Sequence, residues 1–130
     1  MLNQTGIKKE KFVNTDQILF AVEHQVSVGI KVAQAVGVNV GSKKIAKAGT
    51  PLAGNLDART TQFTLANTNG TDVVGILLHD VDVTAGAANA TLLLHGFVNT
   101  DRIDTTTQGK LSEEVKKALT KITFMKGGTV

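Results

Sequence analysis

The feature that most constrains the fold of this chain is an alternation of apolar and polar residues between positions 18 and 32. A period of two is typical of a strand with one buried face, because successive side chains point to opposite sides. Fifteen residues is long for one strand, so we expect a bend or bulge near His24 and Gln25 or at Gly29. His24 takes an inward position in this pattern. The apolar residues on even positions are Ile18, Phe20, Val22, Val26, Val28, Ile30 and Val32.

The alternation extends beyond position 32 and then gives way to turn-forming residues. Residues 41–56 are predicted to form loops and turns, because glycines punctuate them and Pro51 favours an extended Thr50. A short strand is expected around Phe63 and Leu65, followed by a turn at 66–72. The residues that continue the alternation, with the glycines expected to form turns, are Val36, Gly37, Val38, Val40 and Gly41.

Two apolar runs, VVGILLHDVDV at 73–83 and TLLLHGFVNT at 91–100, are predicted to be strands joined by a turn at 84–90. Each run contains consecutive apolar residues instead of a strict alternation. Such runs are typical of strands buried on both faces. We therefore expect these strands in a barrel-like core or against a neighbouring subunit.

The C-terminal region contains a clear helix signal. Ser112 is a favourable N-cap, and two glutamates follow it in the first turn, where the helix dipole favours acids. Apolar residues then recur at helical spacing, at Val115, Ala118, Leu119 and Ile122. These features predict one short helix at about 113–119 and a final strand over 122–125.

The length and composition fit one small domain. The chain has 130 residues, 42% of them hydrophobic, and its many valines, threonines and glycines favour strands and turns. We therefore predict a mostly β (α+β) domain over residues 17–130, preceded by a flexible basic arm at 1–16. The sequence contains no cysteine. We expect no secretory signal and no membrane-spanning segment, because no apolar run follows the N-terminal lysines and none is long enough to span a membrane.

The net charge of +3 is uneven along the chain. Residues 1–49 carry seven lysines and three acids, whereas residues 50–130 carry seven basic and eight acidic residues. A basic N-terminal third suits an acidic protein surface. No direct contact with nucleic acid is expected, because the surplus is small and the chain has five Phe and no Trp or Tyr for stacking on bases.

Four residues, His79, Asp80, Asp82 and His95, are the best candidates for metal binding or acid–base chemistry. In a regular strand His79 and the two aspartates point to opposite faces, so the four do not converge on one metal ion. No serine lies in a nucleophile elbow. We therefore predict no catalytic residue, no metal and no cofactor. Asp80 and Asp82 are interpreted as residues that keep a strand edge solvated and unpaired.

From Ala46 onward the chain resembles the head decoration (capsid-cementing) proteins of tailed phages, of the phage lambda protein D type. The resemblance covers about two-thirds of the chain. It depends on the order and spacing of four segments. They are KAGTPLAGN at 47–55, VVGILLHDVDV at 73–83, TLLLHGFVNTDRI at 91–103 and LSEEVKKALTKITFM at 111–125.

This resemblance implies a β-clip type of fold and a homotrimer on the outer surface of the virion. Such trimers stabilise the expanded phage head, bind the major capsid protein through an N-terminal segment and use no cofactor. The protein would be made in the cytoplasm of the bacterial host. The implied capsid-binding residues are Lys8, Lys9, Lys11, Phe12 and Val13, and the implied trimer-core residues are Thr50, Pro51, Leu52, Ile76, Leu78 and Leu93.

The N-terminal region departs from the family pattern, since more residues precede Thr50 than the family leads us to expect. This region is interpreted as an enlarged capsid-binding arm or an added hairpin. Two other functions stay open. One is another virion component, such as a head fibre or tail protein. The other is a small trimeric β-rich enzyme with His79, Asp80, Asp82 or His95 at a subunit boundary.

Overall fold

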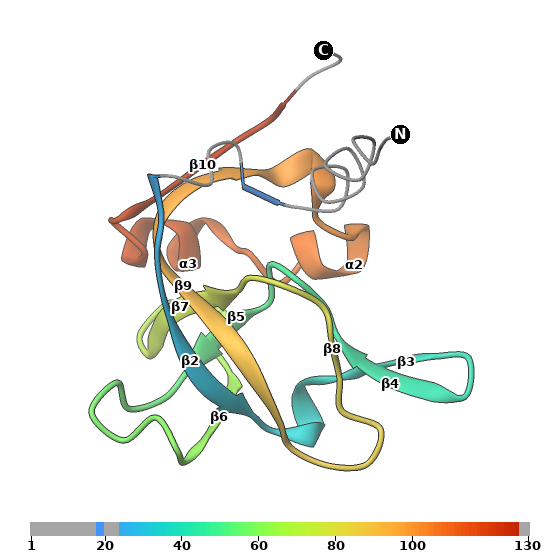
Figure 1. The fold of residues 1–130 in the computed structure, drawn as a ribbon. Coiled ribbons are helices and arrows are strands. Elements are labelled where there is room, and N and C mark those ends of the chain that lie inside the picture. Colours follow the sequence, from blue (N-terminus) through green and yellow to red (C-terminus); the bar gives the residue numbers. More distant parts are fainter. Residues whose placement is uncertain (1–17, 20–23, 128–130) are drawn as a thin grey trace, which may run out of the picture.

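The computed structural model describes residues 18–19 and 24–127, and it is mostly β, as predicted. Five strands form a closed barrel, because β7 pairs with β9 as well as with β5 (Figure 1). An additional strand, β10 (Ile122–Met125), extends the sheet by pairing in parallel with β9. The barrel strands, in the order in which they pair, are β9 (Ala88–Asn99), β2 (Val26–Val32), β6 (Gln62–Leu65), β5 (Pro51–Ala53) and β7 (Val73–Leu77).

The strands predicted to be buried on both faces, β7 and β9, lie between two hydrophobic cores of the same chain. On β9, Leu92 belongs to the barrel interior together with the fully buried Phe63. Its neighbour Leu93 points to the opposite face and packs in a second core that includes Val115 of the C-terminal helix. Adjacent strand residues point to opposite faces, so both must be apolar where both faces are covered.

Strand β2 confirms the predicted alternation and places its irregularity close to the expected position. The register against β9 shifts between Val26 and Ser27 and is regular from Ser27 to Val32. The prediction that His24 points inward is wrong, because this residue is exposed, as is Val26 just before the shift. A register shift interrupts the period-two pattern, so the alternation could not be extrapolated across it. The predicted inward positions of Phe20 and Val22 lie outside the described residues.

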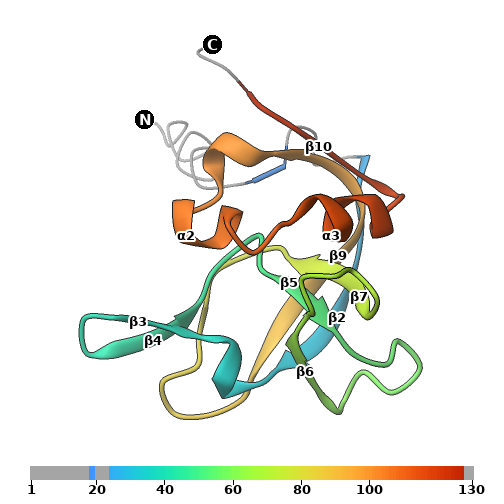
Figure 2. The ribbon, with the colours of Figure 1, turned by 180° about the vertical axis from the view of Figure 1, so that it is seen from behind.

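A second sheet of three strands projects from one side of the barrel (Figures 1 and 2). It contains β3 (Val38–Val40), β4 (Lys43–Ala46) and β8 (Val81–Asp82), and the 3-10 helix η2 (Gln34–Val36) leads into it. Gly41 has a φ of 63° and begins the two-residue turn between β3 and β4. The prediction of loops throughout 41–56 is therefore wrong, since β4 and β5 both lie there.

The single strand predicted over 73–83 is divided into β7 and β8. After Leu77 the chain leaves the barrel wall, and β8 pairs with β4 instead of continuing along β9. Asp80 lies at this break, where its carboxylate accepts a hydrogen bond from the Ala48 N–H at 2.7 Å. That contact lies where the chain passes from one sheet to the other.

Short helices cover one end of the barrel (Figure 2). The predicted C-terminal helix is present as α3 (Glu113–Ala118), and the Ser112 hydroxyl accepts a hydrogen bond from the Val115 N–H at 3.2 Å. The 3-10 helix η3 (Thr100–Arg102) and the helix α2 (Thr105–Gln108) precede it and were not predicted. The sequence of α2, TTTQ, has no apolar periodicity and consists mostly of threonine, which is a poor helix former.

Asn99, at the end of β9, holds the first and last described parts of the chain together. Its backbone N–H donates to the Ile18 carbonyl at 2.7 Å. Its buried side-chain oxygen accepts hydrogen bonds from the N–H groups of Asp101 and Gly127, at 3.0 and 2.9 Å. Ile18 and Gly127 therefore meet at the same end of the barrel.

Candidate interaction surface

The histidine–aspartate stretch at 79–82 makes structural contacts. The Asp80 carboxylate accepts from the Ala48 N–H and lies 3.3 Å from the Lys47 ammonium group. The Thr50 hydroxyl closes the same turn by donating to the Lys47 carbonyl at 2.6 Å. Asp80 thus fixes the turn that leads into β5.

Asp82 has a comparable local role. One of its carboxylate oxygens accepts from the Thr84 N–H at 2.9 Å, which stabilises the turn after β8. Hydrogen bonding by Thr84, first through its hydroxyl and then through its backbone N–H, lowers the pKa of Asp82 from its ordinary value, and the charge of Lys43 adds to this effect. The Thr84 hydroxyl also accepts from the Lys44 N–H at 2.8 Å and so joins β4 to the same turn.

The three histidines do not gather at a site. His24, His79 and His95 are all exposed. The prediction that His79 and Asp80 point to opposite faces of a regular strand does not apply, because both residues lie in the break between β7 and β8. Within residues 18–19 and 24–127, no group of three or more His, Asp or Glu residues is arranged to hold a metal ion.

The residues implied as a trimer core are buried within a single chain. Their relative exposures are at most 6% where a value is given, and Pro51 is buried as well. These residues therefore pack inside the protomer, and they offer almost no area to a second copy. The residues are Thr50, Pro51, Leu52, Ile76, Leu78 and Leu93. The implied capsid-binding residues, Lys8 to Val13, lie outside the described part of the chain.

Three exposed apolar residues, called here the apolar strip, lie on β2, β9 and β10, where these strands adjoin at one end of the barrel. Val26 is 53% exposed, Phe97 39% and Met125 43%. The strand register places them on a diagonal across three strands: Val26 is paired with His95 and Met125 with Asn99, two residues before and two residues after Phe97 on β9. Exposed large apolar side chains that adjoin in this way are typical of a protein-binding surface.

Two further features lie beside this apolar strip. Strand β10 is the last strand of the sheet order, so in the described structure its outer edge has no strand partner. Leu19 forms a bridge to Val98, which places the start of the described chain next to Phe97. A free strand edge and an apolar face together can accept an extended segment of another protein.

Sequence reasoning missed the apolar strip because the register shift before Ser27 determines which face Val26 occupies. A partial signal was present in TLLLHGFVN, where Phe97 shares a strand face with the polar His95. The final strand gave a second signal, because Met125 shares a face with Thr123 and not with the buried Ile122.

No protein-family model matches the chain, and no curated protein sequence is significantly similar to it. Among the described helices, none combines the length and apolar character needed to cross a membrane. The features that bear on function are therefore the resemblance of the sequence to phage head decoration proteins and the exposed apolar strip.

Proposed function

We propose that this chain is a virion structural protein that binds the outer surface of a phage head as a homotrimer and stabilises the expanded head. The observation that supports this best is the arrangement of the four segments that carry the resemblance. They include strand β7, which pairs with both β5 and β9, followed by α3 and the strand β10 that pairs with β9. Segments dispersed along the chain thus form one continuous unit.

The apolar strip supports a role in assembly. It lies at the end of the barrel where Ile18 enters, so a segment preceding Ile18 and the strip can contact the same partner. We assign this end to the major capsid protein. Main-chain hydrogen bonds to an added strand would provide affinity, and the apolar side chains would add buried area.

The charge of the N-terminal region suits the same partner. Three lysines within residues 8–11 would be attracted to an acidic capsid surface. A trimer presents three such segments, and simultaneous engagement raises avidity by roughly 10²–10⁴ over a single one. The β3–β4 hairpin accounts for part of the additional N-terminal length and projects away from the barrel (Figure 1).

Replacing Phe97 by glutamine is expected to weaken head binding at least about tenfold, because a large exposed aromatic side chain at the centre of an interface is typically worth more than 1 kcal/mol. The measurement is co-sedimentation of the purified variant with undecorated heads of the phage whose genome encodes the chain. Leu65→Gln is the matched control, since Leu65 is 45% exposed but lies on β6. Equal losses for the two variants would contradict the assignment of the strip.

A further inference from the structure

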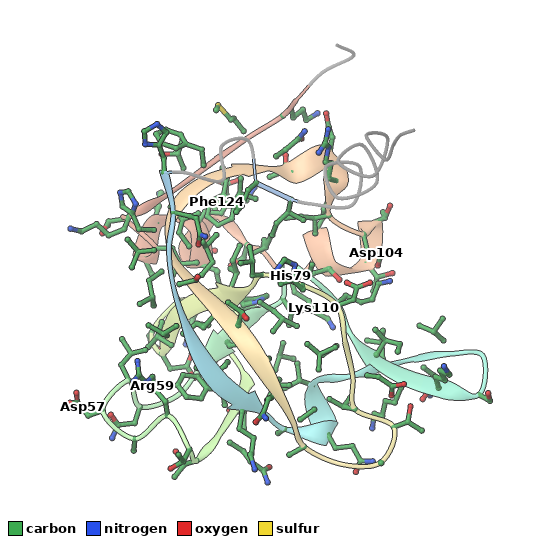
Figure 3. All side chains as sticks on the ribbon, viewed as in Figure 1. Asp57, Arg59, His79, Asp104, Lys110 and Phe124 are labelled. Carbon is green, nitrogen blue, oxygen red and sulfur yellow. The ribbon has the colours of Figure 1, made fainter. Side chains whose placement is uncertain are left out.

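A groove of about 440 Å³ lies on the outer face of the barrel, over β2 and the adjacent part of β9. Gly29 and Lys31 of β2 and Asn89 of β9 line it, and Arg59 and Thr60 form the opposite side. The last two residues belong to the loop between β5 and β6. Figure 3 shows Arg59 and Asp57 on this loop, at the opposite end of the barrel from Phe124 on β10. The groove is therefore separate from the apolar strip.

The groove is open because Gly29 has no side chain, and the backbone conformation at this position does not require a glycine. Its backbone lies outside the left-handed region, and its register with Thr91 of β9 is regular. A Cβ atom at Gly29 would meet no heavy atom within 4 Å. Glycine weakens a strand interior, and where the backbone does not demand it, it often marks the close approach of a ligand or of another backbone.

The edge of β2 next to this groove is unpaired. On the side away from β9, β2 pairs with β6 only at Lys31 and Val32. In the described structure, the backbone of Ser27 to Ile30 has no strand partner on that side. The loop that carries Arg59 and Thr60 leads into β6 and forms the other wall of the groove. An extended segment lying in the groove is therefore next to unpaired backbone N–H and C=O groups of β2.

The side chains at the groove favour a negatively charged ligand. Lys31 and Arg59 provide two cations, and Asn89 and Thr60 provide neutral polar groups. No acidic residue lines the groove, and among the described residues neither cation forms an ion pair. The acidic residue nearest to Arg59 in the sequence is Asp57, on the same loop. The guanidinium group of Arg59 has the planar geometry that binds a carboxylate through two hydrogen bonds.

From these observations we infer that the groove binds an extended, acidic peptide segment of a partner protein. The segment lies over Gly29 on the outer face of β2, beside the free edge of that strand, with carboxylate side chains on Lys31 and Arg59. A phosphate backbone fits less well, because the groove has only two cations and no aromatic side chain to stack on a base. This inference does not rest on the proposed function, since it concerns a different surface and is testable with the isolated chain.

The test uses nitrogen-15-labelled full-length protein and a blocked seven-residue peptide of alternating threonine and glutamate. Addition of the peptide should shift the amide signals of Gly29 to Lys31 and of Arg59 and Thr60. Gly29→Val should abolish these shifts by filling the groove, without lowering the unfolding midpoint. Arg59→Gln should weaken binding about fivefold. Lys43→Gln, which removes an exposed lysine on the β3–β4 hairpin, should leave the affinity unchanged.

Three results would overturn the inference. The first is the absence of amide shifts at millimolar peptide. The second is equal binding by the wild type, Gly29→Val and Arg59→Gln. The third is a larger response of the same amides to a seven-nucleotide oligothymidine, which would identify a phosphate site. A peptide of alternating threonine and lysine serves as the charge control and should cause no shifts.

Discussion

Gly75→Val should lower the free energy of unfolding by about 3 kcal/mol or more, out of the roughly 5–15 kcal/mol typical of a small domain. Gly75 lies in β7 where this strand reaches β9. A Cβ atom there would lie 2.6 Å from the Leu93 carbonyl oxygen and 3.0 Å from Leu92 side-chain atoms. The Leu93 backbone cannot retreat without breaking its pairing with Ile76, which closes the barrel. Urea unfolding followed by circular dichroism measures this loss.

Gly29→Val is the matched control for this substitution. Both glycines lie within barrel strands, but a side chain at Gly29 meets open space. Because valine is the better strand former, this control should keep or raise the unfolding midpoint. If Gly75→Val unfolded at the same urea concentration as the wild type, that result would contradict the close approach of β7 to β9 at Gly75.

Removing residues 1–16 should abolish head binding while the barrel stays folded. The deletion ends before Ile18, whose carbonyl accepts a hydrogen bond from the Asn99 N–H, so the described contacts of the domain are retained. The loss should be at least about 100-fold if three N-terminal segments act together. The measurements are co-sedimentation with heads for binding and urea unfolding for stability.

Two controls separate the contributions within this segment. Neutralising Lys8, Lys9 and Lys11 with glutamine keeps the length and should remove the salt-dependent part of binding. Replacing Phe12 and Val13 with serine keeps the charge and tests the apolar part. Unchanged binding by the truncated protein would show that the N-terminal segment does not contact the head.

The sequence predicted those parts of the fold in which local signals and packing agree. The consecutive leucines of β7 and β9 indicated burial on both faces, and the structure shows why, because Leu92 and Leu93 pack in two different cores. The Ser112 cap and the spacing of the apolar residues after it located α3. In each case the residue pattern shows which faces of the element are buried, and those faces do not depend on which other segment covers them.

Other features depend on contacts between distant segments. The alternation after residue 24 could not reveal the register shift that exposes Val26, because that shift is defined against β9. The break before β8 depends on the Ala48 N–H reaching Asp80, 32 residues away along the chain. Helix α2 begins at the Asp104 cap, and Gln108 holds it by donating to the Thr100 and Ile103 carbonyls, both at 2.8 Å.

The candidate surfaces were the least predictable part. The residues that the resemblance implied as a trimer core are buried in the interior of the protomer. The signal for the groove was Gly29 itself, a glycine within a strand that needs no bulge there. In the sequence, Gly29 was a candidate position for a bend, and only the regular register of β2 shows that there is no bend there.

The most direct test of the proposed function is a cryo-electron microscopy map of the particle produced by the phage whose genome encodes this chain. Our proposal predicts three copies of the barrel around each local three-fold position on the outside of the expanded head, with the Val26–Phe97–Met125 strip facing the major capsid protein. Density for the chain in the tail or in head fibres, or its absence from the particle, would contradict the proposal.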